Sequence, residues 1–206
     1  MSNKTQLQTN NNALDGYIAR VNAAKEVVAT LPEAGSGGGG GNEDFDAFIA
    51  GTLTDINSGA TKIASYAFYL RTELESAYFP NAESIAMYAF NGCSALRSAT
   101  FEKATSVSTY AFRVCPALER VDFWNMTNIG NNVFLTDAAL TAVIIRTNKV
   151  CTLTNKNAFG ESGIANGTGF IYVPASLVDS YRSASNWSTY SSQIRAIEDY
   201  PEITGG

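Results

Sequence analysis

Hydrophobic residues in the central part of the chain recur every 22 residues and keep their register in four columns. The columns are Ile63, Ile85, Val107 and Ile129; Phe68, Phe90, Phe112 and Phe134; Leu74, Leu96, Leu118 and Leu140; and Phe79, Phe101, Phe123 and Ile145. A fixed period of roughly 20 to 50 residues is typical of a solenoid, in which each coil buries its apolar residues against its neighbours. The pattern therefore predicts a stack of thin coils.

One coil reads Ile85-Ala-Met-Tyr-Ala-Phe-Asn-Gly-Cys-Ser-Ala-Leu-Arg-Ser-Ala-Thr-Phe, and a Tyr-Ala-Phe tripeptide recurs at residues 66–68, 88–90 and 110–112. These coils resemble the BspA-type leucine-rich repeat, and the resemblance covers about residues 53–160. The first and last coils depart from the pattern, as expected where one face of a coil has no partner. In the last coil we place Cys151 in the column of Ile63. We expect an α+β chain built on a short leucine-rich-repeat solenoid.

The resemblance and the alternation of a β-strand together indicate which side chains face outward. In Leu74-x-x-Ala77-x-Phe79 and its copies the named residues face the core, so the residues between them face solvent. These outward positions vary from coil to coil, as on a surface adapted to a partner or on one without packing constraint. The candidate binding residues on this face are Tyr78, Thr100, Arg120, Asp122, Trp124, Ile144 and Arg146.

Trp124 is the most informative residue of this face. An exposed tryptophan beside Arg120, Asp122 and Arg146 can stack on a sugar ring or anchor a protein contact, because aromatic and arginine side chains dominate binding energetics. The alternative is that the C-terminal part of the chain covers it.

The N-terminal part of the chain carries a second periodic pattern. Apolar residues spaced by seven, with others three positions later, predict a coiled-coil-like helix that ends before Pro32. The run of glycines after it is a flexible tether, so the helix is predicted to make its contacts outside its own domain. The alternative is an ordinary amphipathic helix packed on that domain. Its oligomerisation residues are Leu7, Leu14, Tyr17, Val21, Val28 and Leu31.

The C-terminal part is predicted to be a strand-helix cap. A strand over residues 170–173 is followed by a helix near residues 176–183 and a second helical stretch over residues 187–197. Leu177, Tyr181, Trp187 and Ile194 would cover the last coil. The predicted organisation is a heptad helix over residues 1–34, a glycine-rich linker over 35–42, the solenoid over 43–160 and the capping unit over 161–206.

Composition removes most catalytic chemistry. The 206 residues include no histidine, and 14 Lys+Arg against 19 Asp+Glu give a net charge of −5, which argues against His-based catalysis and a nucleic-acid partner. Cys93 and Cys115 share one column and lie close enough for a disulfide or a shared metal, but the family pattern has a buried, inert cysteine there. Local acid pairs such as Glu73 with Glu75, or Glu119 with Asp122, define no groove. We predict no enzyme activity, no cofactor and no metal.

The first twelve residues are polar, so we expect no classical signal peptide, and no apolar run is long enough for membrane insertion. A heptad helix, a tether and a short repeat domain together resemble phage and prophage tail-associated proteins of gut bacteria. That resemblance implies a virion protein whose helix forms a homo-oligomer, a trimer by analogy, or docks into tail or baseplate proteins. The solenoid would then contact a host surface protein or glycan. The alternative is a BspA-like adhesin on a bacterial cell surface.

Overall fold

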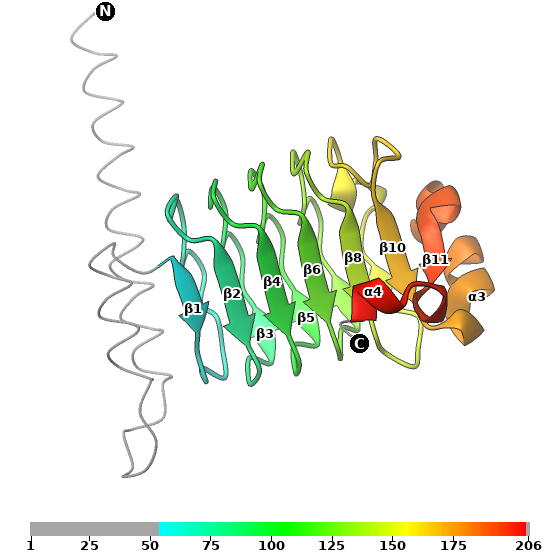
Figure 1. Ribbon diagram of the computed structural model, residues 1–206, viewed down its shortest axis with the longest axis horizontal. Helices are drawn as coiled ribbons and strands as arrows, with labels where there is room; N and C mark the ends of the chain where they lie inside the picture. Colours follow the sequence, from blue (N-terminus) through cyan, green and yellow to red (C-terminus); the bar gives the residue numbers. More distant parts are fainter. Residues whose placement is uncertain (1–53, 205–206) are drawn as a thin grey trace, which may run out of the picture.

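The computed structural model describes residues 54–204, which form a solenoid with two parallel sheets (Figure 1). Successive strands of each sheet pair in parallel, one coil apart. The large sheet runs β1 (Asp55–Asn57), β2 (Ser76–Phe79), β4 (Ser98–Phe101), β6 (Arg120–Phe123), β8 (Ala142–Ile145), β10 (Phe170–Val173) and β11 (Ile194–Ala196). The small sheet runs β3 (Ser84–Ile85), β5 (Ser106–Val107), β7 (Asn128–Ile129) and β9 (Thr152–Leu153). The predicted helix of residues 1–34 and the linker of residues 35–42 lie outside the described residues.

The predicted columns form the core between the two sheets. Phe68, Phe90, Phe112 and Phe134 are fully buried, and neighbouring rings stack with centroids 4.9 to 5.5 Å apart. Phe159 continues this stack at 5.3 Å from Phe134. Stacked aromatic rings add to the stabilisation from area burial. The 22-residue period is therefore the repeat of one packing arrangement from coil to coil.

The register of the last coil corrects one sequence assignment. Ile129 pairs with Leu153, so Leu153 rather than Cys151 continues the column of Ile63. Seven positions separate Ile145 from Thr152, whereas five separate Phe123 from Asn128, so the last turn is two residues longer. Cys151 is nevertheless fully buried, as predicted for a core residue.

Two positions in each of four successive coils have left-handed backbone. The first column is Tyr66, Tyr88, Tyr110 and Asn132, and the second is Leu70, Gly92, Val114 and Thr136, with φ between 51° and 77°. The three tyrosine rings stack with centroids 5.1 Å apart. Leu70, Met87 and Val114 are exposed in the same turns. These turns reverse the chain between the two sheets, which explains why they require positive φ.

The C-terminal part caps the last coil. After β10 come η2 (Ala175–Leu177), α3 (Val178–Ser183) and η3 (Trp187–Gln193). The indole Nε1–H of Trp187 donates to the carbonyl of Cys151 at 2.6 Å, and the hydroxyl of Tyr181 accepts from the Cys151 N–H at 2.9 Å. The cap therefore supplies the hydrogen bonds that a further coil would have made. The predicted strand and the predicted buried positions Tyr181, Trp187 and Ile194 are confirmed.

The predicted second helical stretch is wrong at its end. Residues Ile194–Ala196 form β11, which pairs in parallel with β10 and extends the large sheet. Pairing satisfies the backbone groups at this edge, which favours a strand over a helix.

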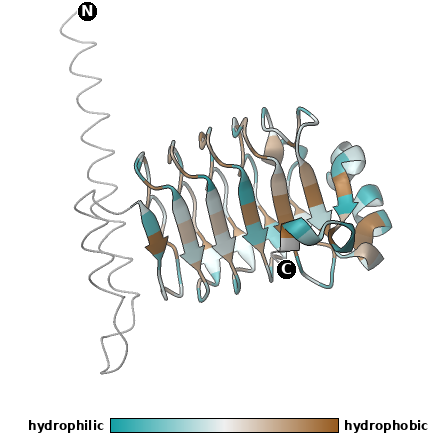
Figure 2. Ribbon diagram, viewed as in Figure 1, coloured by the Kyte–Doolittle hydropathy of each residue, from teal (hydrophilic) through white to brown (hydrophobic). Residues whose placement is uncertain are grey.

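Residues 197–204 then fold back over the outer face of the sheet, as η4 (Ile197–Asp199) and α4 (Pro201–Thr204). Figure 1 shows α4 in front of the ends of β8 and β10, and Figure 2 shows that these strands are hydrophobic where it crosses them. A small second core results, formed by Ala142, Ile144, Tyr172 and Ile197 with Phe170, Tyr200 and Ile203 packed against it. No helix of residues 54–204 is long and apolar enough to cross a membrane.

Candidate functional site

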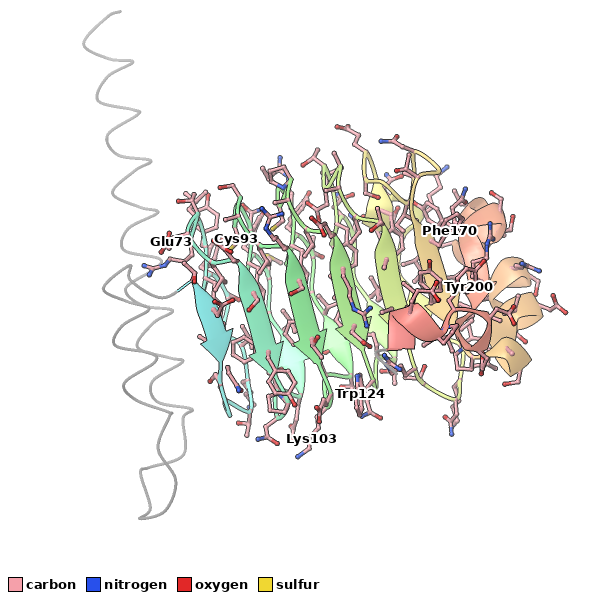
Figure 3. All side chains as sticks on the ribbon, in the orientation of Figure 1. Glu73, Cys93, Lys103, Trp124, Phe170 and Tyr200 are labelled. Atoms are coloured by element: carbon pink, nitrogen blue, oxygen red, sulfur yellow. The ribbon has the colours of Figure 1, made fainter. Side chains whose placement is uncertain are left out.

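The exposed part of the outer face lies over β2, β4 and β6 and the turns that follow them. Tyr78 is 37% exposed and Trp124 is 45% exposed. Both were predicted to face outward, and the C-terminal segment does not cover Trp124. We call Tyr78, Glu102, Lys103, Trp124 and Arg146 the aromatic row. Figure 3 shows Lys103 and Trp124 projecting from the same end of the large sheet.

The predicted exposure of two candidate residues is wrong. Asp122 is 3% exposed and Ile144 is fully buried. Ile144 lies in the small second core under the C-terminal segment, because an apolar outward residue next to Tyr172 is covered when residues 197–204 fold back. Of the remaining candidates, Thr100 is half-buried in the middle of β4.

Asp122 connects the aromatic row to the C-terminal segment. Its carboxylate accepts from Arg146 at 2.9 and 2.8 Å and from Arg120 at 3.1 Å. Arg120 also donates to the carbonyl of Ile203 at 2.7 Å, which holds α4 on the sheet. The hydrogen bond to Asp122 raises the pKa of Arg146, and the Coulombic attraction of Asp122 adds to that effect. Sequence alternation placed these residues on one face correctly, but it gave no sign that the tail packs against them.

Arg146 is placed against Trp124. Its guanidinium carbon lies 5.5 Å from the centroid of the indole ring, within the range of a cation–π contact. Because Asp122 fixes the guanidinium from one side, the orientation of Arg146 over the ring is set before any ligand arrives.

The polar members of the row are held by bonds between coils. The Tyr78 hydroxyl donates to the Glu102 carboxylate at 2.5 Å, and this bond raises the pKa of Tyr78. Lys103 Nζ donates to Asn81 Oδ1 at 2.8 Å, and Asn125 Nδ2 donates to the Glu102 carbonyl at 2.5 Å. Sequence reasoning did not select Lys103, Asn81 or Asn125, because they lie in turns where strand alternation no longer assigns a side. These three residues are spaced by 22 in the sequence, and this shared spacing was the signal that could have identified them.

The cysteines pack as thiols. Cys93, Cys115 and Cys151 are free and buried. The Cys93 thiol donates to the carbonyl of Phe68 at 3.0 Å and the Cys115 thiol to that of Phe90 at 3.1 Å. Burial raises the pKa of all three, that of Cys151 to about 12. A thiol that stays protonated is a poor nucleophile and metal ligand. The predicted burial of these cysteines in the core is confirmed.

Asp137 is a buried acid that sequence reasoning missed. It occupies the column of Cys93 and Cys115, is fully buried, and accepts the Cys115 N–H through Oδ1 at 2.7 Å. Its Oδ2 has no hydrogen-bond partner, and burial raises its pKa well above the usual range. The sequence signal that could have identified Asp137 is an acidic residue in a column whose other members, Cys93 and Cys115, are small and buried.

The local acid pairs noted in the sequence are separated by ion pairs. Glu73 pairs with Arg71, and Glu119 pairs with Arg97 on the surface, so these acids do not converge. A shallow hollow between β9 and η3 is lined by residues 150–154 and 184–187, none of which is charged. No group of three or more Cys, Asp or Glu in this part of the chain is arranged to hold a metal ion.

The parallel strands, the 22-residue coils and the buried columns define a leucine-rich-repeat solenoid. Residues 52–177 match the BspA type leucine rich repeat region in six copies. This match spans more than half of the chain, so the chain belongs to the BspA-type leucine-rich-repeat family. No curated protein matches it. Among solved structures, the leucine rich repeat protein of T. pallidum is similar, with 21% identity and a TM-score of 0.48 over 59% of this chain. The match spans 56% of that protein.

Proposed function

We propose that this protein is a non-enzymatic binding protein whose aromatic row contacts a protein or glycan on a cell surface. The observation that carries the proposal is the exposure of Tyr78 and Trp124 on a face where the neighbouring apolar residues are covered. Burying two aromatic side chains on a partner is favourable, and arginine beside them is typical of binding surfaces. The family match supports a repeat surface as the working part of the molecule.

The free face is small. Three strands at about 4.8 Å from each other and about 3.3 Å per residue give an area on the order of 200 Å², against about 800 Å² per partner in a stable protein interface. A single copy would therefore bind weakly. Oligomerisation through Leu7, Leu14, Tyr17, Val21, Val28 and Leu31 would present several faces at once and raise the avidity.

We also propose where this binding protein acts. The order of heptad pattern, glycine tether and repeat domain in the sequence supports a phage or prophage tail-associated protein, with the N-terminal residues in the tail and the solenoid toward the host. The second candidate is a BspA-like adhesin of the bacterial cell surface, which family membership favours. Antibody labelling of phage particles and of cell envelopes distinguishes the two.

Binding is tested by attachment of the labelled full-length protein to candidate cells. Trp124→Ala and Tyr78→Ala should each reduce attachment severalfold. Met87→Ala removes an exposed apolar side chain from a turn outside the aromatic row, next to Tyr88, and should leave attachment unchanged. Unchanged attachment of both aromatic variants would contradict the proposal. Equal urea midpoints for the variants would show that folding is intact.

Oligomerisation is tested by sedimentation of the full-length chain beside Leu14→Asp/Val21→Asp. The wild type should sediment as an oligomer, a trimer being expected, and the double variant as a monomer, because a charge in an apolar seam removes the interface. A monomeric wild type would rule out avidity through this helix.

A further inference from the structure

Resting on the proposed function, we propose that the aromatic row binds a linear acidic glycan in which neutral and uronate sugars alternate. The glycan would lie along the solenoid axis, across β2, β4 and β6. Tyr78 and Trp124 would each stack against a neutral sugar, and Lys103 would pair with the carboxylate of the uronate between them.

The spacing of the row supports this order. Tyr78 lies on β2, Lys103 follows β4 and Trp124 follows β6, so the three residues come from three successive coils. Adjacent strands are about 4.8 Å apart, and the two aromatic residues are therefore about 10 Å apart along the axis. One coil step is close to the length of one pyranose in an extended chain. Successive sugars would therefore meet successive coils.

The charges of the row favour an anion. The row holds Lys103, Arg146 and Glu102, which is one net positive charge on a chain of net charge −5, and the neighbouring pair of Arg120 and Asp122 adds no net charge. Arg120 and Arg146 are committed to Asp122. Within residues 54–204 Lys103 forms no ion pair, and its ammonium contacts the neutral amide of Asn81. One exposed ammonium between two aromatic residues complements one carboxylate in each disaccharide.

The remaining groups suit neutral sugars. The Glu102 carboxylate can accept a sugar hydroxyl in addition to the Tyr78 hydroxyl that it already binds. Arg146 lies over the Trp124 ring and is fixed by Asp122, while nearly half of the Trp124 surface stays free for stacking. Because these side chains are already held by bonds between coils, a ligand orders few rotamers on binding.

The test is calorimetric titration of the full-length protein with hyaluronan hexasaccharide, in which the two sugar types alternate. The same hexasaccharide with its carboxylates reduced to alcohols should bind about tenfold more weakly, the effect of losing a charge-assisted contact. Lys103→Met should lower the affinity for the acidic hexasaccharide by a similar factor and leave the affinity for the reduced hexasaccharide unchanged. Trp124→Ala should lower the affinity for both. The control Lys156→Met, at an exposed lysine outside the row, should change neither.

Two outcomes would overturn the inference: no binding of the hexasaccharide at millimolar concentration, or equal affinity of wild type and Lys103→Met. Competition on cells separates this failure from that of the proposed function. If attachment depends on Trp124 but the hexasaccharide does not compete, the partner is a protein or another glycan and the proposed function stands. If attachment does not depend on the row, both proposals fail.

Discussion

The carboxylate of Asp122 accepts two hydrogen bonds from the guanidinium of Arg146 in the next coil, from Nε at 2.9 Å and from Nη2 at 2.8 Å. This bidentate pair is partly buried, with 5% of the Asp122 side chain and 24% of the Arg146 side chain exposed. Arg146 in turn lies against Trp124. A buried carboxylate therefore holds the arginine that lies over an exposed aromatic ring, and Arg146→Ala is a test of folding as much as of binding.

Asp122→Ala should destabilise the protein by about 2 kcal/mol, because Arg120 and Arg146 lose their shared partner while partly buried. Urea unfolding of the two proteins measures the change. Asp179→Ala is the matched control, since the side chain of Asp179 is fully exposed beside Arg182, and its unfolding midpoint should not move. Equal midpoints for Asp122→Ala and Asp179→Ala would contradict the role given to the pair.

Asp137→Asn should make the protein more stable at alkaline pH and reduce the pH dependence of its unfolding. Burial raises the pKa of Asp137 well above the value of about 3.9 in the unfolded chain. Between the two pKa values the unfolded chain releases the proton and the folded chain keeps it, so the free energy of unfolding falls as pH rises, by about 1.4 kcal/mol per pH unit. The asparagine keeps an acceptor for the Cys115 N–H.

Urea unfolding between pH 4 and pH 9 measures this difference, with Glu83→Gln as the control at an exposed acid. The free energy of unfolding of Asp137→Asn should exceed that of the wild type by an amount that grows with pH, and the control should follow the wild type. A difference that does not change with pH would show that the buried carboxyl does not titrate in this range.

Trp187→Ala should destabilise the protein far more than Trp124→Ala. Trp187 is 1% exposed and donates to the Cys151 carbonyl, so its removal leaves a cavity and an unpaired carbonyl and should cost about 3 to 5 kcal/mol. Trp124 is 45% exposed, and its removal should cost less than about 1 kcal/mol. Thermal unfolding of both variants gives the comparison. A small loss for Trp187→Ala would mean that the cap contributes little.

Val114→Gly should stabilise the protein by about 0.5 to 1 kcal/mol. Val114 has a φ of 62° and is exposed. A branched side chain in left-handed backbone costs about 1 to 2 kcal/mol, which exceeds the entropy that glycine adds to the unfolded chain. Gly92→Ala, the opposite kind of change at the matching position of the preceding coil, should destabilise the protein, since the φ of Gly92 is 77° and the end of the Leu70 side chain would have to move away from the added Cβ. Urea midpoints that shift in the same direction for both variants would contradict this account.

The columns of the core could be predicted because each coil repeats one packing problem. Core residues pack against their counterparts in the coils before and after, as Phe90, Leu96, Phe101 and Val107 do. Residues that are 22 positions apart in the sequence are therefore neighbours in the fold. Strand alternation and the family resemblance together identified Tyr78 and Trp124 as outward residues. The periodicity failed where the period itself changes, at the longer turn before β9.

The sequence alone determined the solenoid, its core columns and the outward strand positions, because these depend on local alternation and a regular repeat. The buried residues of the cap followed from the resemblance of the C-terminal part to the family. Only the tertiary structure decided which outward residues are free. Residues 197–204 carry no periodic signal, and they cover Ile144 through contacts with Tyr172 and through the bond from Arg120 to the carbonyl of Ile203. Such contacts join residues distant in the chain, and a backbone carbonyl leaves no trace in the sequence.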